Sequence, residues 1–255
     1  ISQSNIVFKN PSTMKKELTM VETYVKKIRT ILNKVAVNSD IDLLTPLIDT
    51  IDEMLESEIT GEEVNELSES VTCIMSTTSF YSNDYSRIYS LLLKKYEFLR
   101  DIFETHDTKY LKSYENVKDV NPDEDYDLFC SVNKDNDKRR AITLFFTKLY
   151  FTHNSIEKDR ILYLLVEVVS SLYNNINNPE MIYLNDELVE NICIFIQHDN
   201  SNLFEISDKS YIKNQDINIQ DFIVKIGKSK PKQYTGISTK SLFKLMETIE
   251  AIEKS

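Results

Sequence analysis

The chain has 255 residues, and its 41 acidic against 30 basic side chains give a formal net charge of −11. This balance argues against binding nucleic acid through the whole surface, although a local basic patch can still hold RNA. With only three glycines, the sequence lacks the glycine-rich loops of nucleotide-binding enzymes, and no clustered His, Cys or paired carboxylates mark a catalytic centre. We therefore expect an interaction protein, with neither catalytic activity nor a cofactor.

The polar segment over residues 1–13 has no signal-peptide pattern; we expect it to be an N-terminal tail, and the chain to be a piece of a longer protein. Cys73, Cys130 and Cys193 are odd in number and far apart, which indicates buried reduced thiols in an intracellular compartment. The most apolar segment, 161–169, is interrupted by Glu167 and is too short for a bilayer, which needs about 20 residues.

Apolar residues at three- and four-residue spacing predict amphipathic helices over 21–35 and 44–55. Thr60, followed by Glu63, has the pattern of a capping box that opens a third helix. An aromatic-rich stripe over 85–103 predicts one long, central helix. The segment 117–137, with Asn121-Pro122 and many acids around a short expected core patch of Tyr126, Leu128, Phe129 and Cys130, is expected to be the longest break.

Helical periodicity resumes over 139–151, 159–173 and 186–197, with expected starts at Asp137, Ser155 and Asn185. A short helix over 219–226, a basic loop over 227–236 and a terminal helix capped by Ser238 complete the chain. About nine or ten helices with short connections predict an all-α fold of about five stacked antiparallel pairs, a HEAT-like α-solenoid.

The charges are unevenly distributed, because residues 35–86 contain no Lys or Arg. The acids that gather there are Asp40, Asp42, Asp49, Asp52, Glu53, Glu56, Glu58, Glu62, Glu63, Glu66, Glu69 and Asp84. They are either a solvated face of two consecutive helices or a surface that docks a basic partner.

Two basic groups are candidate RNA contacts, since lysines near phosphates release counterions. They are Lys134, Lys138, Arg139 and Arg140 at a helix start, and Lys225, Lys228, Lys230 and Lys232 in the C-terminal region. A solvated helix face or loop is the alternative for both.

Other motifs carry little weight. Gly227-Lys228-Ser229 resembles the end of a phosphate-binding loop, but Phe222 stands where that motif needs a glycine. The three histidines are isolated, so no metal site is expected. The run Tyr183-Leu184-Asn185-Asp186-Glu187-Leu188-Val189 matches a cap-binding-protein docking pattern, but Leu188 and Val189 lie on a predicted core face, and we interpret the match as chance.

Three pieces of the sequence together resemble the middle domain of eukaryotic translation initiation factor 4G. The first is Ile28-Arg29-Thr30-Ile31-Leu32-Asn33-Lys34 at the end of the first helix. The second is the helix over 81–99, and the third runs from Arg139-Arg140-Ala141 through Phe146 and Lys148 to Leu149-Tyr150. The resemblance covers residues 14–226. We expect residues 227–255 to form a basic loop and a C-terminal helix that packs on the solenoid. Composition and the acidic insert are similar to versions in giant DNA viruses. Val35-Ala36-Val37 after Lys34 departs from the cellular pattern.

The resemblance implies a scaffold that binds and activates a DEAD-box RNA helicase of the initiation factor 4A type in the cytoplasm, or in the host cytoplasm if the protein is viral. It implies helicase contacts through Arg29, Asn33, Lys34, Asp49, Asp52, Glu53 and Glu56. mRNA is a further expected partner, and a cap-binding protein would bind through segments outside this chain. The alternatives are an RNA-processing or mRNA-decay scaffold on the same domain, and an RNA-binding α-solenoid.

Overall fold

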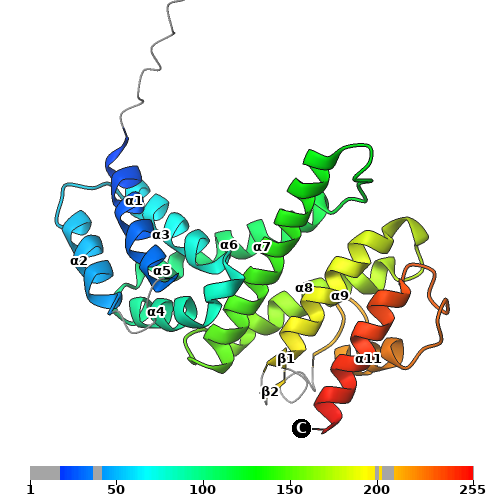
Figure 1. Ribbon diagram of the computed structural model, residues 1–255. Coiled ribbons are helices and arrows are strands. Elements are labelled where there is room, and N and C mark those ends of the chain that lie inside the picture. The colour runs from blue at the N-terminus through cyan, green and yellow to red at the C-terminus, as the bar shows by residue number, and fades with distance from the viewer. Residues whose placement is uncertain (1–17, 37–41, 199–200, 203–209, 255) are drawn as a thin grey trace, which may run out of the picture.

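The computed structural model describes residues 18–36, 42–198, 201–202 and 210–254, so the predicted tail over 1–13 lies outside the described residues. The described chain is a succession of helices packed side by side into a curved array (Figure 1). Only two short strands occur in it: β1 (Gln197–His198) pairs antiparallel with β2 (Ser201–Asn202). The predicted all-α solenoid class is confirmed.

The α-helices are α1 (Met20–Leu32), α2 (Leu44–Leu55), α3 (Gly61–Ser76), α4 (Ser82–Lys95), α5 (Phe98–Asp101), α6 (Phe103–Lys112), α7 (Tyr126–Phe151), α8 (Lys158–Asn175), α9 (Ile182–Ile196), α10 (Ile219–Gly227) and α11 (Thr239–Lys254). Four 3₁₀ turns join them: η1 (Asn33–Ala36), η2 (Ser79–Tyr81), η3 (Ser113–Asn116) and η4 (Pro179–Met181).

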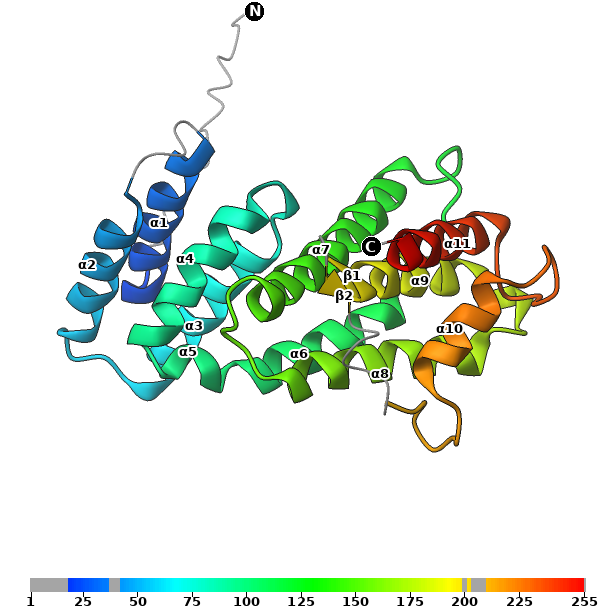
Figure 2. The same cartoon turned by 90° about the horizontal axis from the view of Figure 1, so that it is seen from below.

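The helices stack mainly on their neighbours in the array. α1 packs on α2 and α3, α3 on α4, α8 on α9, and α11 on both α9 and α10. α7 lies in the middle, where it packs against α4 on one side and α9 on the other (Figure 2). Its second half supplies Phe145 and Phe146 to the core, and the Phe146 ring meets Phe103 edge-on at 6.0 Å.

The helix starts show which local signals in the sequence are reliable. The capping box at Thr60 is confirmed: its hydroxyl accepts from the Glu63 N–H at 3.3 Å, and Glu63 Oε2 accepts from the Thr60 N–H at 2.8 Å. The Ser238 hydroxyl accepts from the Ser241 N–H at 3.0 Å at the start of α11, as predicted. Side-chain acceptors at these positions satisfy N–H groups that the first helical turn leaves unpaired.

The predicted helix over 85–103 is wrong as one element, because α4 ends at Lys95 and Tyr96 takes an extended conformation with φ −119° and ψ 102°. The Tyr96 hydroxyl donates to Asp52 Oδ1 at 2.7 Å, and its ring packs beside Phe98. These contacts hold Tyr96 toward α2, and the chain continues into α5 and then α6, which the sequence did not predict.

The predicted break over 117–137 is also wrong beyond residue 125. Asp125 Oδ1 accepts from the Leu128 N–H at 2.9 Å and opens α7 a full three turns before Asp137. Of the other expected starts, Ser155 precedes the actual start of α8 at Lys158, and Asn185 is a buried residue inside α9. The apolar residues at the start of α7 end at Val132 and are followed by the polar run 133–140, so no continuous apolar periodicity marks the first half of α7, which is why it was missed.

Candidate interaction surfaces

The first candidate surface, called here the α1–α2 surface, consists of the seven residues that the resemblance proposed for helicase contacts: Arg29, Asn33, Lys34, Asp49, Asp52, Glu53 and Glu56. Arg29, Asn33 and Lys34 are all exposed at the C-terminal end of α1 and the start of η1. The four acids lie at three- and four-residue spacing, so they share one face of α2.

Two of the four acids already have partners within the protein. Asp52 Oδ2 pairs with Lys95 at 2.5 Å, and the hydrogen bonds from Lys95 and then Tyr96 hold the pKa of Asp52 below its ordinary value. Glu53 pairs with Lys27 of α1 at 3.1 Å. Asp49 and Glu56 are exposed and form no ion pair with any described residue. Asp52 and Glu53 therefore help to hold α2 against its neighbours, and Asp49 and Glu56 are free for an external partner.

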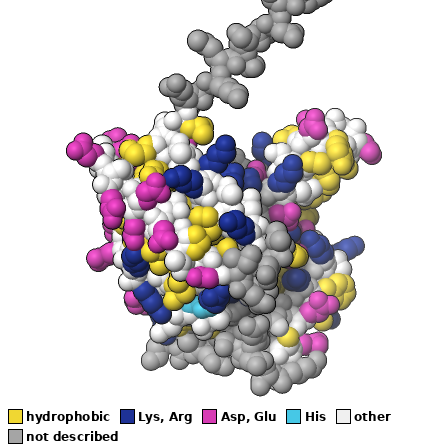
Figure 3. All heavy atoms as spheres, turned by 60° about the vertical axis from the view of Figure 1, so that its left-hand side comes forward, with side chains coloured by type: hydrophobic (Ala, Val, Ile, Leu, Met, Phe, Trp, Pro, Cys, Tyr) yellow, Lys and Arg dark blue, Asp and Glu magenta, His cyan; other side chains and the backbone are white. Residues whose placement is uncertain are grey.

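Most acidic side chains of α2 and α3 have no lysine partner among the described residues, so this part of the surface is strongly negative. In the part of the chain that the structure describes, lysines of neighbouring helices pair with it at Asp52, Glu53 and Glu69, the last with Lys109 of α6 at 2.7 Å. Glu58, Glu62 and Glu66 are exposed and form no ion pair within the described ranges. Figure 3 shows the acidic side chains spread over the end of the molecule that contains α2. Such a field attracts and orients a basic surface.

The basic residues on α7 divide into exposed and internal ones. Lys134 and Lys138 are exposed, although Lys138 also pairs with Asp135 at 2.8 Å. Arg139, in contrast, is only 2% exposed and donates from Nη1 to the Ser113 carbonyl at 2.9 Å. Arg139 is therefore an interior residue and is not available to RNA at the surface. The run of cations in the sequence could not reveal this, because the partners lie on other elements.

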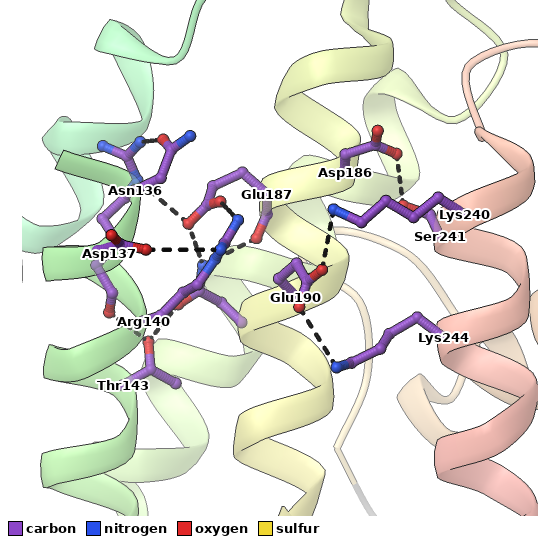
Figure 4. A network of polar contacts seen from close by, with 12 residues as sticks. Asn136, Asp137, Arg140, Thr143, Asp186, Glu187, Glu190, Lys240, Ser241 and Lys244 are labelled. Atoms are coloured by element: carbon purple, nitrogen blue, oxygen red, sulfur yellow. Dashed lines mark hydrogen bonds and ion pairs between the residues drawn. The ribbon is translucent and has the colours of Figure 1, made fainter. Parts of the chain in front are cut away.

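Arg140 belongs to a polar network that joins α7, α9 and α11 (Figure 4). Its Nη2 donates to the buried Glu187 Oε2 at 2.6 Å, and Glu187 Oε1 accepts from Asn191 Nδ2 at 3.0 Å. Burial raises the pKa of Glu187, and Arg140 opposes that shift. On the other side of α9, Glu190 pairs with Lys240 and Lys244 of α11 at 3.2 Å and 3.5 Å. The network has a structural role, since its charged groups are paired with each other.

The second basic group lies at the end of α10 and in the connection that follows it. All four lysines are exposed, and Lys228 also pairs with Glu253 of α11 at 3.0 Å. Lys225 also lines a pocket of about 640 Å³ beside Tyr173 and Tyr234. These lysines lie on α10 and in the connection before α11, whereas Lys134 and Lys138 lie on α7, so the two groups belong to different elements.

A pocket of about 400 Å³ lies between α3, α6 and α7. The residues around it include Cys73, Ile102, His106, Tyr110 and Ile142. Burial lowers the pKa of His106 to about 4, so its ring is neutral at pH 7. The walls are largely apolar and suit an apolar group. Sequence reasoning missed this pocket because its residues come from three helices that are distant in the chain.

Cys73 is exposed at this pocket, Cys130 is half-buried and only Cys193 is buried, so the expectation of three buried thiols is wrong. All three are free thiols. Among the described residues, no group of three His, Cys, Asp or Glu side chains is arranged to hold a metal ion. The described helices also include none that is long and apolar enough to cross a membrane.

Comparison with known proteins gives no relative: no family model, no curated protein and no solved structure matches the chain.

Proposed function

We propose that the protein is a scaffold that binds a DEAD-box RNA helicase of the initiation factor 4A type through the α1–α2 surface, and so acts in translation initiation. The observation that carries the proposal is a set of exposed charges, without ion pairs to any described residue, at one end of the array: Arg29, Lys34, Asp49 and Glu56. The partner class comes from the sequence resemblance to the middle domain of initiation factor 4G.

In the proposed mechanism the protein acts by holding the two lobes of the helicase in one arrangement. A helicase of this kind has two lobes that open and close during ATP turnover, and a curved helical array can contact both. A scaffold that binds one arrangement of the lobes more tightly shifts the helicase toward it, by as much as its affinities for the two states differ. The array itself then needs no catalytic residue.

The test is calorimetric binding of an initiation-type DEAD-box helicase, together with its ATPase rate in the presence and absence of the protein. The double variant Asp49→Lys with Glu56→Lys is expected to lose binding and stimulation together. Glu62→Lys with Glu66→Lys on α3 changes the net charge equally and is expected to retain both. Asp52 and Glu53 are poor choices for the test, because their replacement also removes internal ion pairs.

Binding without stimulation would favour a scaffold for RNA processing or mRNA decay. No binding would refute the proposal. A second candidate, an RNA contact, is supported by the exposed Lys225, Lys230 and Lys232. RNA affinity through these lysines should fall steeply with salt and be lost when all three become Gln.

A further inference from the structure

The first half of α7 stands away from the rest of the array (Figure 1). The helix has 26 residues, and its first buried residue is Arg139. Residues 121–128, which form the preceding loop and the first turn, are all exposed. A free helix end surrounded by water ordinarily carries polar side chains on every face.

This helix end instead carries large apolar side chains. Tyr126 is 67% exposed and Leu128 is 41% exposed, and the Tyr126 ring lies 6.5 Å from the ring of Phe129. We call these three residues the arm patch. Figure 3 shows an apolar area with acidic groups beside it on the lobe that projects at the upper right. Tyr126 and Phe129 share one face of the helix and Leu128 lies on the face next to Phe129, so apolar side chains gather at this one helix end, as is typical of an interaction site.

The charges around the arm patch define what can cover it. No Lys or Arg lies between Lys118 and Lys134, and the acids in that interval are Asp119, Asp123, Glu124, Asp125 and Asp127. Asp125 caps α7, and Glu124 accepts from Asn121 Nδ2 at 3.2 Å. None of the five forms an ion pair with a described residue. Nor are they arranged as a metal site, since the described chain holds no suitable group of three ligands.

We propose that the arm patch docks a basic amphipathic helix of a partner protein, with an apolar row against Tyr126, Leu128 and Phe129 and with Lys or Arg on both flanks. The apolar contact supplies affinity, and opposite charge supplies orientation and rate. A second copy of this chain is the wrong partner, because a symmetric contact would place the same acids against each other. RNA is excluded by the sign of the charge. This docking site lies on α7 and does not depend on the α1–α2 surface.

The probe is a fluorescent peptide of about 18 residues, five helical turns, with leucines on one face and lysines elsewhere. Its affinity is measured by anisotropy at physiological salt. One control peptide keeps the leucines and replaces Lys by Glu, and another keeps the lysines and replaces Leu by Ser. We expect only the first peptide to bind.

Two pairs of matched variants locate the site. Tyr126→Ser with Leu128→Ser should weaken binding about tenfold or more, the effect of removing a central apolar anchor. Tyr163→Ser with Phe243→Ser removes side chains of similar exposure, 50% and 52%, on α8 and α11 and should leave affinity unchanged.

A second pair, of triple variants, tests the role of the acids. The arm variant carries Asp123→Asn, Glu124→Gln and Asp127→Asn, and its control carries Glu58→Gln, Glu62→Gln and Glu66→Gln, which alters the net charge by the same amount. We expect the arm variant alone to weaken binding by about tenfold. These side chains are exposed, so circular dichroism should show every variant folded.

Three results would overturn the proposal. The first is equal loss in both charge variants, because the peptide would then respond to the overall negative charge. The second is failure of the basic amphipathic peptide to bind. The third is self-association in sedimentation that Tyr126→Ser with Leu128→Ser abolishes, since the patch would then join copies of this chain. Each outcome is independent of helicase binding, so it leaves the proposed function to its own test.

Discussion

Replacement of Gly236 by alanine is expected to destabilise the protein strongly. Gly236 is buried in the connection before α11, and a Cβ built there would lie 2.5, 2.7 and 2.8 Å from the carbonyl oxygens of Asn175, Asn178 and Ile176. All three contacts are backbone atoms of the α8–α9 turn, which no side-chain rotation can relieve. The connection must therefore move away from this turn.

The movement also breaks hydrogen bonds. The Gly236 N–H donates to the Ile176 carbonyl at 2.9 Å, and the Gly236 carbonyl accepts from Asn185 Nδ2 at 2.8 Å. Overpacking by one methyl group costs about 1–3 kcal/mol, and each lost hydrogen bond about 0.5–1.5 kcal/mol. We expect a loss of about 3 kcal/mol in the free energy of unfolding, which lowers Tm by about 6–12 °C for a chain of this size.

The assay is urea unfolding followed by far-UV circular dichroism. The chain provides its own controls in its other two glycines. At Gly61 nothing lies within 4 Å of the added Cβ, so Gly61→Ala should stabilise α3 by about 0.5 kcal/mol through helix propensity. At Gly227 the added Cβ meets only the end of the Ile249 side chain closely, so the cost should be about 1 kcal/mol. A Gly236→Ala variant within about 1 kcal/mol of wild type would refute the steric argument.

Three further predictions follow from buried groups. Tyr89→Phe should cost about 1–2 kcal/mol in urea unfolding, because the Thr72 hydroxyl loses its 2.6 Å partner inside the core. Burial holds the pKa of His106 at about 4, below the ordinary 6.5, so the unfolded chain takes up a proton there at a higher pH than the folded protein. The stability that the neutral ring contributes is therefore full above pH 6.5 and is lost as the pH falls toward 4. Between those limits, wild type should lose up to about 1.4 kcal/mol per pH unit more than His106→Gln, and parallel pH curves would contradict this. Cys193 is buried and its pKa is raised to about 11, whereas Cys73 is exposed, so a thiol reagent should modify Cys73 in the native protein and Cys193 only after denaturation.

Local signals in the sequence predicted much of the fold. The Thr60 and Ser238 caps and the amphipathic spacing over 44–55 depend on residues close together in the chain, and the structure has them where expected. The end of α4 at Lys95 was not predictable in this way, because it depends on Tyr96 reaching Asp52 on another helix. The contacts of Tyr96 with another helix end α4 there, although the apolar spacing continues to residue 103.

The candidate surfaces show the same limit. Exposure of Asp49 and Glu56 follows from their place on the polar face of α2. The interior position of Arg139 does not, because Ser113 and Glu187, its partners, come from η3 and α9. The expected core patch of Tyr126, Leu128 and Phe129 is wrong for a different reason: these residues lie at the exposed end of α7, and only the three-dimensional arrangement shows that this end extends into solvent.

The position of α7 has a consequence for how the molecule unfolds. In a linear array each unit touches only its neighbours, so the ends can unravel independently. Here α7 contacts α3, α4, α8 and α9, and it acts as a hub that joins both halves of the array into one cooperative unit. Amide protons in the second half of α7 should exchange only through global unfolding, while those of α1, α2 and α11 exchange through local opening at the two ends.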